Sequence, residues 1–251
     1  MYIFFDLDDT LLTKKKEITP FTKEILNKCR NLGHKLVINT ARGFLATKSI
    51  IEELNPDFSV LNAGALVIDR DLNQVYKSPI TEDLDKIILD IYSCSEKVMI
   101  QTIDILYSSN ENDVTETTKY IDVNDVDLNE FFKGGAYKIV PRKIDLDKAY
   151  KIKDKYNLDF CIYGSGTWTR FCKYGTTKAK GMKVVIQYDG GSIEDTISFG
   201  DDYGDLEMLL ESKIGVAMAN SVLEVKEKAK YHTCSNEEDG VAEFLKKYFN
   251  L

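Results

Sequence analysis

The sequence opens with Met1-Tyr2-Ile3-Phe4-Phe5-Asp6-Leu7-Asp8-Asp9-Thr10-Leu11-Leu12, and the rest of the chain is interpreted around this stretch. The apolar run from Ile3 to Phe5 predicts a buried strand. Asp6 and Asp8 follow it, and in an extended backbone both side chains point to one side. Like charges this close repel unless a proton or a cation offsets them. Because ligands bind at the carboxyl ends of strands in open α/β sheets, the pair suits a hard cation such as Mg²⁺.

A solvated acidic turn after an edge strand is the alternative explanation of Asp6 and Asp8. Asp is a common turn residue, so the Asp-x-Asp spacing alone does not separate the two explanations. The position directly after an apolar strand favours a site only slightly. The residues at the other predicted strand ends are therefore needed to distinguish a metal site from a solvated turn.

The composition limits the class of protein. The 251 residues suffice for one large domain or two of ordinary size. The net charge of −8 argues against nucleic acid or an anionic membrane as partner, although a local cation cluster still allows a phosphorylated substrate. Five scattered cysteines without a Cys-x-x-Cys pair favour reduced thiols over a zinc site. Since no signal peptide or long apolar run is found, we expect a cytoplasmic protein.

The first third of the chain alternates strands with helices. Thr19-Pro20 predicts a helix start, and apolar runs at 35–39 and 58–61 predict two further buried strands. A helix ending near Leu54 separates those strands, and a small hairpin is expected over 66–76. This alternation predicts a parallel sheet with right-handed crossovers.

The character of the sequence changes near Pro79. Short strand-like pieces alternate with polar turns, and helical patterns occur at 81–91 and 146–156. The strand-like pieces are 98–102, 105–108, 137–140, 160–163 and 168–172. Few of them read as the continuous apolar run of a buried parallel strand. We therefore predict an inserted α+β domain over residues 80–176.

From residue 177 the alternation of helices and apolar strands returns. A helix is predicted at 180–188, strands at 196–199 and 214–218, and a final helix at 240–249. Residues 1–79 and 177–251 together predict one α/β domain, a doubly wound parallel-sheet core of Rossmann-like architecture. The α+β domain is inserted into it.

Four groups of polar residues share one kind of predicted position, at the carboxyl end of a parallel strand or at a helix start. They are Asp6/Asp8, Thr40/Arg42, Lys178/Lys180 and Asp201/Asp205. Each alone has an ordinary explanation, such as a helix cap, a solvated lysine or a turn. Together they supply a nucleophile, acid/base carboxylates, metal oxygens, a hydroxyl donor and a cation. Phosphoryl transfer requires these parts.

The order and spacing of these groups resemble the haloacid dehalogenase superfamily, and specifically the Cof-type phosphatases with a large α/β cap. The resemblance covers essentially the whole chain. Its four motifs are Asp6–Leu11, Ile38–Arg42, Lys180-Gly181 (with Lys178 a nearby competitor for the lysine) and Gly200–Asp205. It implies that residues 1–79 and 177–251 form the catalytic core and that 80–176 form the cap that selects the substrate.

The resemblance also implies a mechanism. Asp6 attacks the phosphoryl group and forms an aspartyl-phosphate, which divides one difficult step into two. Asp8 protonates the leaving oxygen and then, as a carboxylate, takes a proton from the hydrolytic water. Mg²⁺ is expected on Asp6, the backbone carbonyl of Asp8 and Asp201, with Asp205 as a ligand or a supporting partner.

The same resemblance assigns the remaining contacts. Thr40 and Lys180 are expected to bind the phosphoryl group. Arg42 either faces the substrate or forms a structural salt bridge. Asn220 is a candidate substrate contact next to the fourth-motif loop, with a helix cap as the alternative. Arg170 of the cap is a candidate substrate contact, with a solvated cation as the alternative.

Two departures from the family pattern affect these expectations. Gly204 stands where relatives usually carry Asn, so one amide beside the metal site is missing. Ala63 stands where relatives usually carry Asn after the third strand, which leaves substrate contacts near that loop open.

The function we predict is a Mg²⁺-dependent phosphatase of a small phosphorylated metabolite, such as a sugar phosphate or a nucleotide-like monoester. A phosphomutase or phosphotransferase with the same site is an alternative, as is a catalytically silent sugar-phosphate sensor. A receiver domain fits poorly because the acidic cluster follows the first strand and a long insertion interrupts the fold. A monomer is adequate, since the cap is part of the same chain.

Overall fold

The computed structural model describes residues 1–163 and 168–251. The chain forms two compact units. The first contains Met1–Arg42, Ser49–Tyr76 and Thr177–Leu251, and the second contains Gly43–Lys48 and Lys77–Thr176. The predicted domain boundaries lie at 79/80 and 176/177. In the structure the chain passes from one unit to the other at 76/77 and at 176/177, and Gly43–Lys48 also belongs to the second unit.

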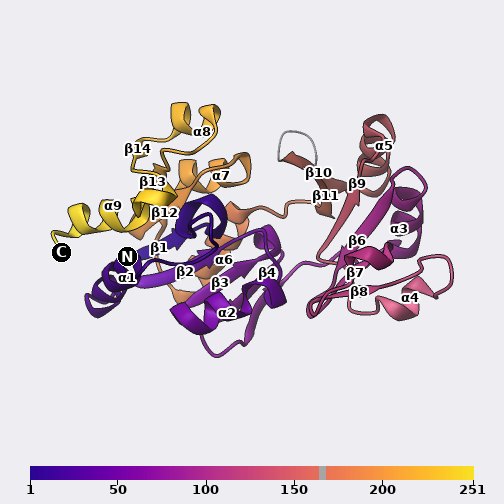
Figure 1. The fold of residues 1–251 in the computed structure, drawn as a ribbon, viewed down its shortest axis with the longest axis horizontal. Coiled ribbons are helices and arrows are strands. Elements are labelled where there is room, and N and C mark those ends of the chain that lie inside the picture. The colour runs from indigo at the N-terminus through magenta and orange to yellow at the C-terminus, as the bar shows by residue number, and fades with distance from the viewer. Residues whose placement is uncertain (164–167) are drawn as a thin grey trace. The chain divides into compact units, whose positions relative to one another are not determined.

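An eight-stranded sheet forms the centre of the first unit (Figure 1). Its strands are β1 (Tyr2–Phe5), β2 (Lys35–Asn39), β3 (Phe58–Leu61), β4 (Leu66–Asp69), β5 (Gln74–Lys77), β12 (Thr196–Gly200), β13 (Ile214–Ala217) and β14 (Tyr231–His232). Their spatial order is β14-β13-β12-β1-β2-β3-β4-β5. From β14 to β3 neighbouring strands are parallel, and β4 is antiparallel to β3. The predicted parallel sheet is confirmed, with β1 at its middle.

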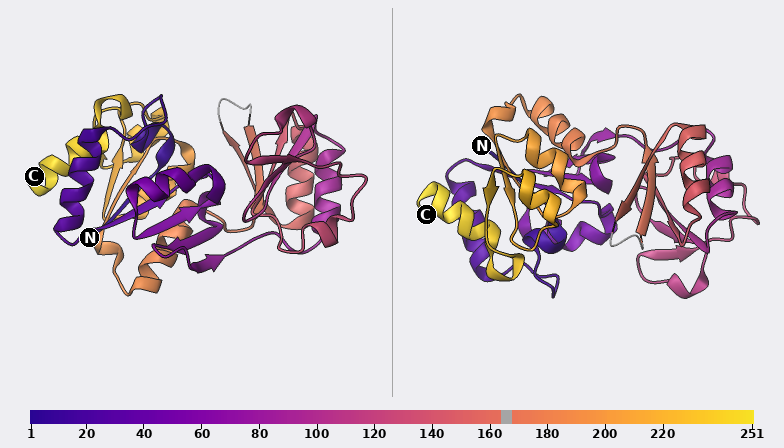
Figure 2. Two further views of the ribbon diagram at one scale, coloured as in Figure 1. Left: turned by 60° about the horizontal axis from the view of Figure 1, so that its bottom comes forward. Right: turned by 90° about the horizontal axis from the view of Figure 1, so that it is seen from above.

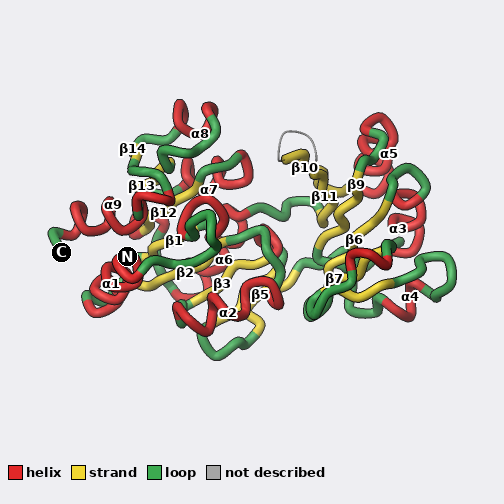
Figure 3. Tube along the Cα trace, viewed as in Figure 1, coloured by secondary structure: helices red, strands yellow, loops and turns green. Residues whose placement is uncertain are grey.

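Helices cover both faces of this sheet (Figures 2 and 3). They are α1 (Pro20–Asn31), α2 (Phe44–Leu54), α6 (Lys178–Asp189), α7 (Tyr203–Glu211), α8 (Leu223–Lys228) and α9 (Gly240–Phe249). On one face Phe4 of β1 packs with Met182 of α6 and Met208 of α7. On the other, Phe199 of β12 makes an edge-to-face contact with Phe244 of α9. Apolar side chains on both faces of the central strands therefore produce the predicted doubly wound core.

Hydrogen bonds between residues close in sequence set the starts of helices α1 and α6. Thr19 caps α1, because its Oγ1 accepts a hydrogen bond from the backbone N–H of Thr22 at 3.0 Å. Gly33, at φ 84°, follows the end of α1. Thr177 caps α6 in the same way, accepting from the N–H of Lys180 at 3.1 Å. Helix α6 therefore begins at Lys178, two residues earlier than predicted.

The second unit is built on a six-stranded sheet. Its strands are β6 (Lys97–Gln101), β7 (Leu106–Ser108), β8 (Thr118–Tyr120), β9 (Lys138–Arg142), β10 (Leu158–Tyr163) and β11 (Trp168–Lys173), in the order β10-β11-β9-β6-β7-β8. All neighbours pair antiparallel except β7 and β8, which pair parallel. The helices are α3 (Leu84–Tyr92), α4 (Leu128–Phe131) and α5 (Leu146–Tyr156).

One face of the second sheet is covered by α3 and α5, which contact each other. Ile87 of α3 and Ile152 of α5 share a buried cluster with Val98, Ile139 and Phe171 from the strands. An antiparallel sheet with helices on one face is the predicted α+β arrangement. Among the residues that the structure describes, no helix is both long enough and apolar enough to span a membrane.

Candidate active site

The candidate site lies at the carboxyl edge of the first sheet. Asp6 follows β1, and its backbone N–H still donates to Phe199 of β12 at 3.2 Å. Thr40 follows β2 and Asp201 follows β12, the two strands that flank β1. Since parallel strands end at the same edge, the topology brings the expected residues of three motifs to neighbouring strand ends.

A buried lysine joins two of the carboxylates. The Lys178 Nζ lies 2.7 Å from Asp6 Oδ1 and 2.5 Å from Asp205 Oδ1, and all three residues are buried. Burial alone lowers the pKa of Lys178, but the charges of Asp205 and Asp6 outweigh it, so its pKa is raised. Lys178 is therefore a permanent ammonium between the two carboxylates.

The lysine that meets Asp6 is thus Lys178, and the assignment to Lys180 needs correction. Lys180 is exposed, whereas Lys178 lies on the buried side of α6 with Met182, four residues later. With 3.6 residues per turn, two positions correspond to roughly 200° around the helix, so the two lysines point in opposite directions. The start of α6 at Lys178 decides which of them faces the sheet.

Three carboxylates meet beside this lysine. Ligand oxygens of Asp6, Asp201 and Asp205 all lie within 4.8 Å of one another. Oδ2 of Asp205 accepts from the backbone N–H groups of Asp201 and Asp202, at 3.1 Å each. Thr10 Oγ1 donates to Asp201 Oδ1 at 2.7 Å. Hydrogen bonds therefore fix the orientation of the acidic cluster.

The charge balance of this cluster calls for a cation. Burial raises the pKa of Asp201 to about 8, and the charges of Asp205 and Asp6 add to the rise. Burial also raises the pKa of Asp6, although Lys178 opposes the effect. If all three carboxyl groups are ionised, Lys178 offsets only one of their three negative charges. A divalent cation with oxygen ligands fits this donor set, and Asp6, Asp201 and Asp205 would hold it.

Asp8 is held by two cations. Arg42 donates through Nε to Oδ2 at 2.7 Å and through Nη2 to Oδ1 at 2.6 Å, and Lys16 Nζ lies 2.7 Å from Oδ1. Burial acts to raise the pKa of Asp8, but the hydrogen bonds from Arg42 and Lys16 lower it to about 2. Asp8 is therefore ionised in the free protein. Of the two expectations for Arg42, the structure shows a salt bridge.

Thr40 is buried directly after β2. Its backbone N–H donates to Val60 and its carbonyl accepts from Ala63, both at 2.9 Å, so the neighbouring strand end holds it in place. Its Oγ1 accepts from the backbone N–H of Arg42 at 3.2 Å. That bond uses the oxygen as an acceptor, so the hydroxyl proton can be donated to another group.

Comparison with protein families agrees with this geometry. The model of the haloacid dehalogenase-like hydrolases matches residues 3–245, nearly the whole chain. The chain belongs to this family. Both the predicted family and the predicted status as an enzyme are thereby confirmed.

Relatives of similar length include proteins named as phosphatases and as putative phosphatases. The chain is 27% identical to a 5-amino-6-(5-phospho-D-ribitylamino)uracil phosphatase, YitU, of Bacillus subtilis, over 99% of this chain and 97% of the relative. It is 29% identical to the putative phosphatase YkrA of the same organism, over 97% and 96%. A solved structure of a haloacid dehalogenase-superfamily phosphatase from Bacteroides thetaiotaomicron, BT1666, superimposes with a TM-score of 0.85 at 19% identity, covering 100% of this chain and 95% of the other.

Asn220 has its carboxamide engaged with backbone groups. Nδ2 donates to the carbonyl of Asp9 at 2.7 Å, and Oδ1 accepts from the N–H of Asn236 at 3.1 Å. Asn236 in turn donates to the carbonyl of Leu12 at 2.8 Å. These contacts tie the loop after β13 to the acidic turn, so in this hydrolase Asn220 supports the turn that carries Asp8.

Arg170 lies on β11 of the second unit, largely buried, with Nη2 3.7 Å from Cys161 Sγ of the neighbouring strand. It stays a predicted substrate contact. Sequence reasoning missed Lys16, whose contact with Asp8 depends on a loop that no motif marks. It also assigned no separate role to Asn236, although that residue begins a stretch that resembles the family.

The structure shows what surrounds Gly204, the residue that stands where relatives usually carry Asn. Gly204 lies in the first turn of α7, directly before Asp205, and a Cβ added there meets no heavy atom within 4 Å. The site therefore has room for a larger residue, or for water, where many members of the family carry an amide.

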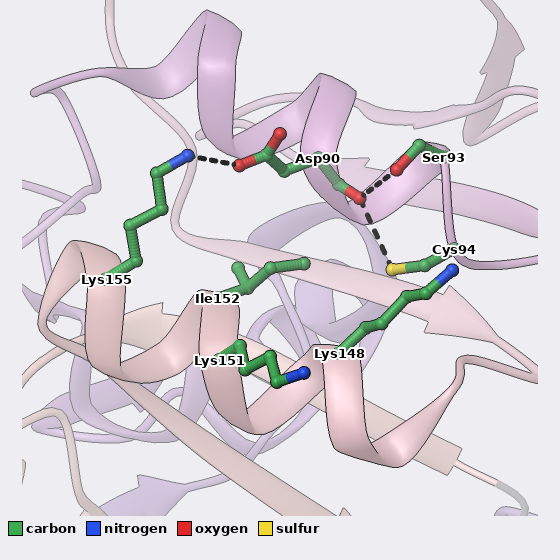
Figure 4. A pocket seen from close by; sticks show the side chains of 7 residues that line it. All are labelled: Asp90, Ser93, Cys94, Lys148, Lys151, Ile152 and Lys155. Atoms are coloured by element: carbon green, nitrogen blue, oxygen red, sulfur yellow. Dashed lines mark hydrogen bonds and ion pairs between the residues drawn. The ribbon is translucent and has the colours of Figure 1, made fainter.

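A separate cavity of about 220 Å³ lies between α3 and α5 in the second unit (Figure 4). Three lysines from α5 line it, and Lys155 pairs with Asp90 at 2.9 Å. Ser93 Oγ and Cys94 Sγ both donate to the Asp90 carbonyl at the end of α3. None of the residues expected to catalyse phosphoryl transfer lines this cavity.

Proposed function

We propose that this member of the haloacid dehalogenase family is a Mg²⁺-dependent phosphatase of a small phosphorylated metabolite, with Asp6 as the nucleophile. The observation that carries the proposal is the surroundings of Asp6. Its carboxylate is buried at a strand end, paired with Lys178 and within 4.8 Å of oxygens of Asp201 and Asp205. Lys178, and a divalent cation once these carboxylates hold it, would supply the positive charge that a phosphate dianion needs before a carboxylate can attack it.

Each residue of the core has a distinct part in the proposed reaction. Asp6 forms a bond to phosphorus while the ester oxygen leaves, and water then cleaves the aspartyl-phosphate. Lys178 stabilises the ionised form of Asp6 and the negative charge of the phosphoryl oxygens. Thr40 donates its hydroxyl proton to one of those oxygens. When bound, Mg²⁺ would neutralise charge on the phosphoryl group.

Asp8 is the proposed general acid and base. In the free protein it is ionised, because Arg42 and Lys16 hold both of its oxygens. An arriving phosphate dianion repels this carboxylate and competes for the two cations, and both effects raise the pKa of Asp8. Asp8 can then carry the proton that the leaving oxygen needs and later accept one from water.

The relatives support the proposed substrate class. YitU is named for a phosphorylated ribityl compound, and this chain matches it over nearly the full length of both proteins. We propose a monoester of similar size for this chain, with the second unit as the cap and Arg170 as one of its substrate contacts. A cytoplasmic location, a monomeric state and the absence of nucleic-acid or membrane partners belong to the same proposal.

Phosphate release from a panel of monoesters tests the function. With Mg²⁺, the wild-type protein should release phosphate from p-nitrophenyl phosphate or acetyl phosphate, and chelation by EDTA should abolish the release. The matched variant is Asp6→Asn, which keeps the shape of the side chain but removes its charge. If wild type and variant release equal phosphate across the panel, the enzyme proposal is wrong.

The same panel separates the alternatives. A phosphomutase or phosphotransferase would move the phosphoryl group to an added sugar or alcohol faster than to water. A silent sensor would bind a sugar phosphate without turnover. The Asp6–Lys178 pair, with three carboxylates in reach of one cation, favours catalysis over sensing.

A further inference from the structure

A buried carboxamide lies at the end of β2, next to two parts of the candidate site. Asn39 follows three apolar residues of this strand and is itself fully buried. It directly precedes Thr40, and its Nδ2 donates to the backbone carbonyl of Lys178, the first residue of α6, at 2.9 Å. A side chain of β2 therefore binds the start of the helix that carries Lys178 to Asp6.

The hydrogen-bonding capacity of this carboxamide is only partly used. Nδ2 faces two acceptors, the Lys178 carbonyl and Met208 Sδ, which lies 3.1 Å away. Oδ1 has no hydrogen-bond partner among the residues that the structure describes. A buried acceptor without a partner destabilises the folded state, because it has lost its hydrogen bonds to water.

The neighbours of Asn39 make a packing role insufficient to explain it. Val37, two residues earlier on β2, and Val60, its paired residue on β3, belong to the apolar cluster that α6 and α7 cover. An apolar side chain would extend this cluster and leave no polar atom unpartnered. The carboxamide therefore points to a role beyond packing, and its one backbone contact at the site is with Lys178.

We propose that Asn39 is a positioning residue, whose hydrogen bond fixes the first turn of α6 against β2 so that the Lys178 ammonium reaches Asp6. The inference rests on the proposed part of Lys178 in phosphoryl transfer. The same bond joins the start of α6 to the strand end that carries Thr40. The two groups expected to bind the phosphoryl oxygens are thereby held in one arrangement, and small displacements of such groups lower reaction rates strongly.

Replacement by valine tests this role. Asn39→Val removes both the donor and the unpartnered acceptor, and valine is a favourable residue in a buried strand. We expect kcat for p-nitrophenyl phosphate with Mg²⁺ to fall about tenfold and KM to stay within about twofold, because the charge of Lys178 acts mainly in the transition state. The melting temperature should not fall, since an unpartnered buried acceptor is removed. Asn39→Ala, which adds no bulk, repeats the comparison if the valine variant does not fold.

A double-variant cycle with Lys178→Met separates positioning from a general structural role. If Asn39 acts through Lys178, Asn39→Val should lower kcat about tenfold in wild type but less than about twofold when residue 178 is already Met. A general loosening of the core would instead lower kcat by the same factor in both backgrounds. That result would overturn the proposal, as would an unchanged kcat in the single variant.

Ser198→Ala is the matched control. Ser198 is also fully buried in a central strand, β12, and its Oγ donates to a helix carbonyl, that of Met208 in α7, at 3.5 Å. Because this bond does not involve α6, kcat should stay within about twofold of wild type even if the melting temperature falls. Equal kcat losses in Ser198→Ala and Asn39→Val would overturn the proposal alone. Absence of phosphate release by wild type would reject the phosphatase function, and this inference with it.

Discussion

At the scale of single residues, Lys178 is the cation that two buried carboxylates share. It lies between Asp6 and Asp205, and all three residues are buried. Losing its charge leaves two buried carboxylates without their common partner, and such a loss is far more costly than removal of an exposed charge.

We therefore expect Lys178→Met to lower kcat by roughly a hundredfold or more, since electrostatic stabilisation of this kind commonly contributes at that level. Lys180→Met, on the exposed side of the same helix, should stay within about twofold of wild type. Steady-state kinetics on p-nitrophenyl phosphate measure both, with a thermal melt of each variant to confirm folding. Equal losses for the two variants would contradict the assignment.

Gly204 offers a gain-of-affinity experiment. A side chain has space there, and an Asn would place an amide next to Asp205. We expect Gly204→Asn to tighten Mg²⁺ binding several-fold, because groups that orient metal ligands commonly change affinity by tenfold or more. Gly204→Ala controls for the gain in helix propensity that accompanies the replacement of Gly. If Ala raises Mg²⁺ affinity as much as Asn does, the amide has no role.

The sequence predicted some of these residues better than others. Asp6, Thr40 and Asp201 could be placed together because each follows a strand of one parallel sheet. The lysine could not be chosen from the sequence, since the choice depends on the residue at which α6 begins. The sequence also left open whether Arg42 faces the substrate or forms a salt bridge. The direction of a side chain after a strand end is set by tertiary contacts, which the local sequence does not show.

At the scale of elements, the loop after β3 positions the start of α6. Gly64 has φ 105°, and a Cβ added to it would lie 2.1 Å from the backbone oxygen of Thr177, the residue that caps α6. This close approach fixes the end of the helix that carries Lys178. Backbone strain and contact distance both exclude a side chain at this position.

We expect Gly64→Ala to lower the melting temperature and the activity together, with a destabilisation of about 2 kcal/mol or more. Gly33→Ala is the control, because Gly33 also has a positive φ but an added Cβ meets nothing within 4 Å. Thermal melts of both variants separate backbone strain, present in both, from the collision, present in one. Similar losses in the two variants would show that strain alone matters.

Elements with strong patterns were predicted almost as found. The bounds of β2 and β3 were predicted from their apolar runs, and the start of α1 from its cap. All of them agree with the structure within a residue or two. Strand β8 was missed, because Thr118-Lys119-Tyr120 is a short, polar edge segment without an apolar run. Its pairing with β7 is parallel and long-range, and local sequence does not encode such a partner.

At the scale of the whole molecule, the acidic cluster links stability to pH. The pKa of Asp201 is about 8 in the folded protein and 3.8 ordinarily. Between these values the folded state keeps a proton that the unfolded state has lost, so unfolding releases it and becomes more favourable as pH rises. The metal-free protein should therefore lose stability from about pH 4 to pH 8 on account of this group.

Mg²⁺ should reverse that trend, because it binds the ionised carboxylates and replaces the proton. We expect the melting temperature in EDTA to fall between pH 6 and pH 8, and the gain from added Mg²⁺ to be larger at pH 8. Asp201→Asn should weaken both effects. A metal-free protein that grows more stable over this pH range through Asp201 would contradict the account.

The central claim, that Asp6 is the nucleophile, is tested most directly by trapping the phosphorylated enzyme. Asp8→Asn should slow hydrolysis of the intermediate, whereas the first step can proceed because p-nitrophenolate leaves phosphorus without needing a proton. After mixing with Mg²⁺ and an acid quench, mass spectrometry should find one phosphoryl group on the peptide that contains Asp6, and none when Asp6→Asn is added to the variant. Mg²⁺-dependent turnover with no phosphoryl group ever detected on Asp6 would contradict the claim.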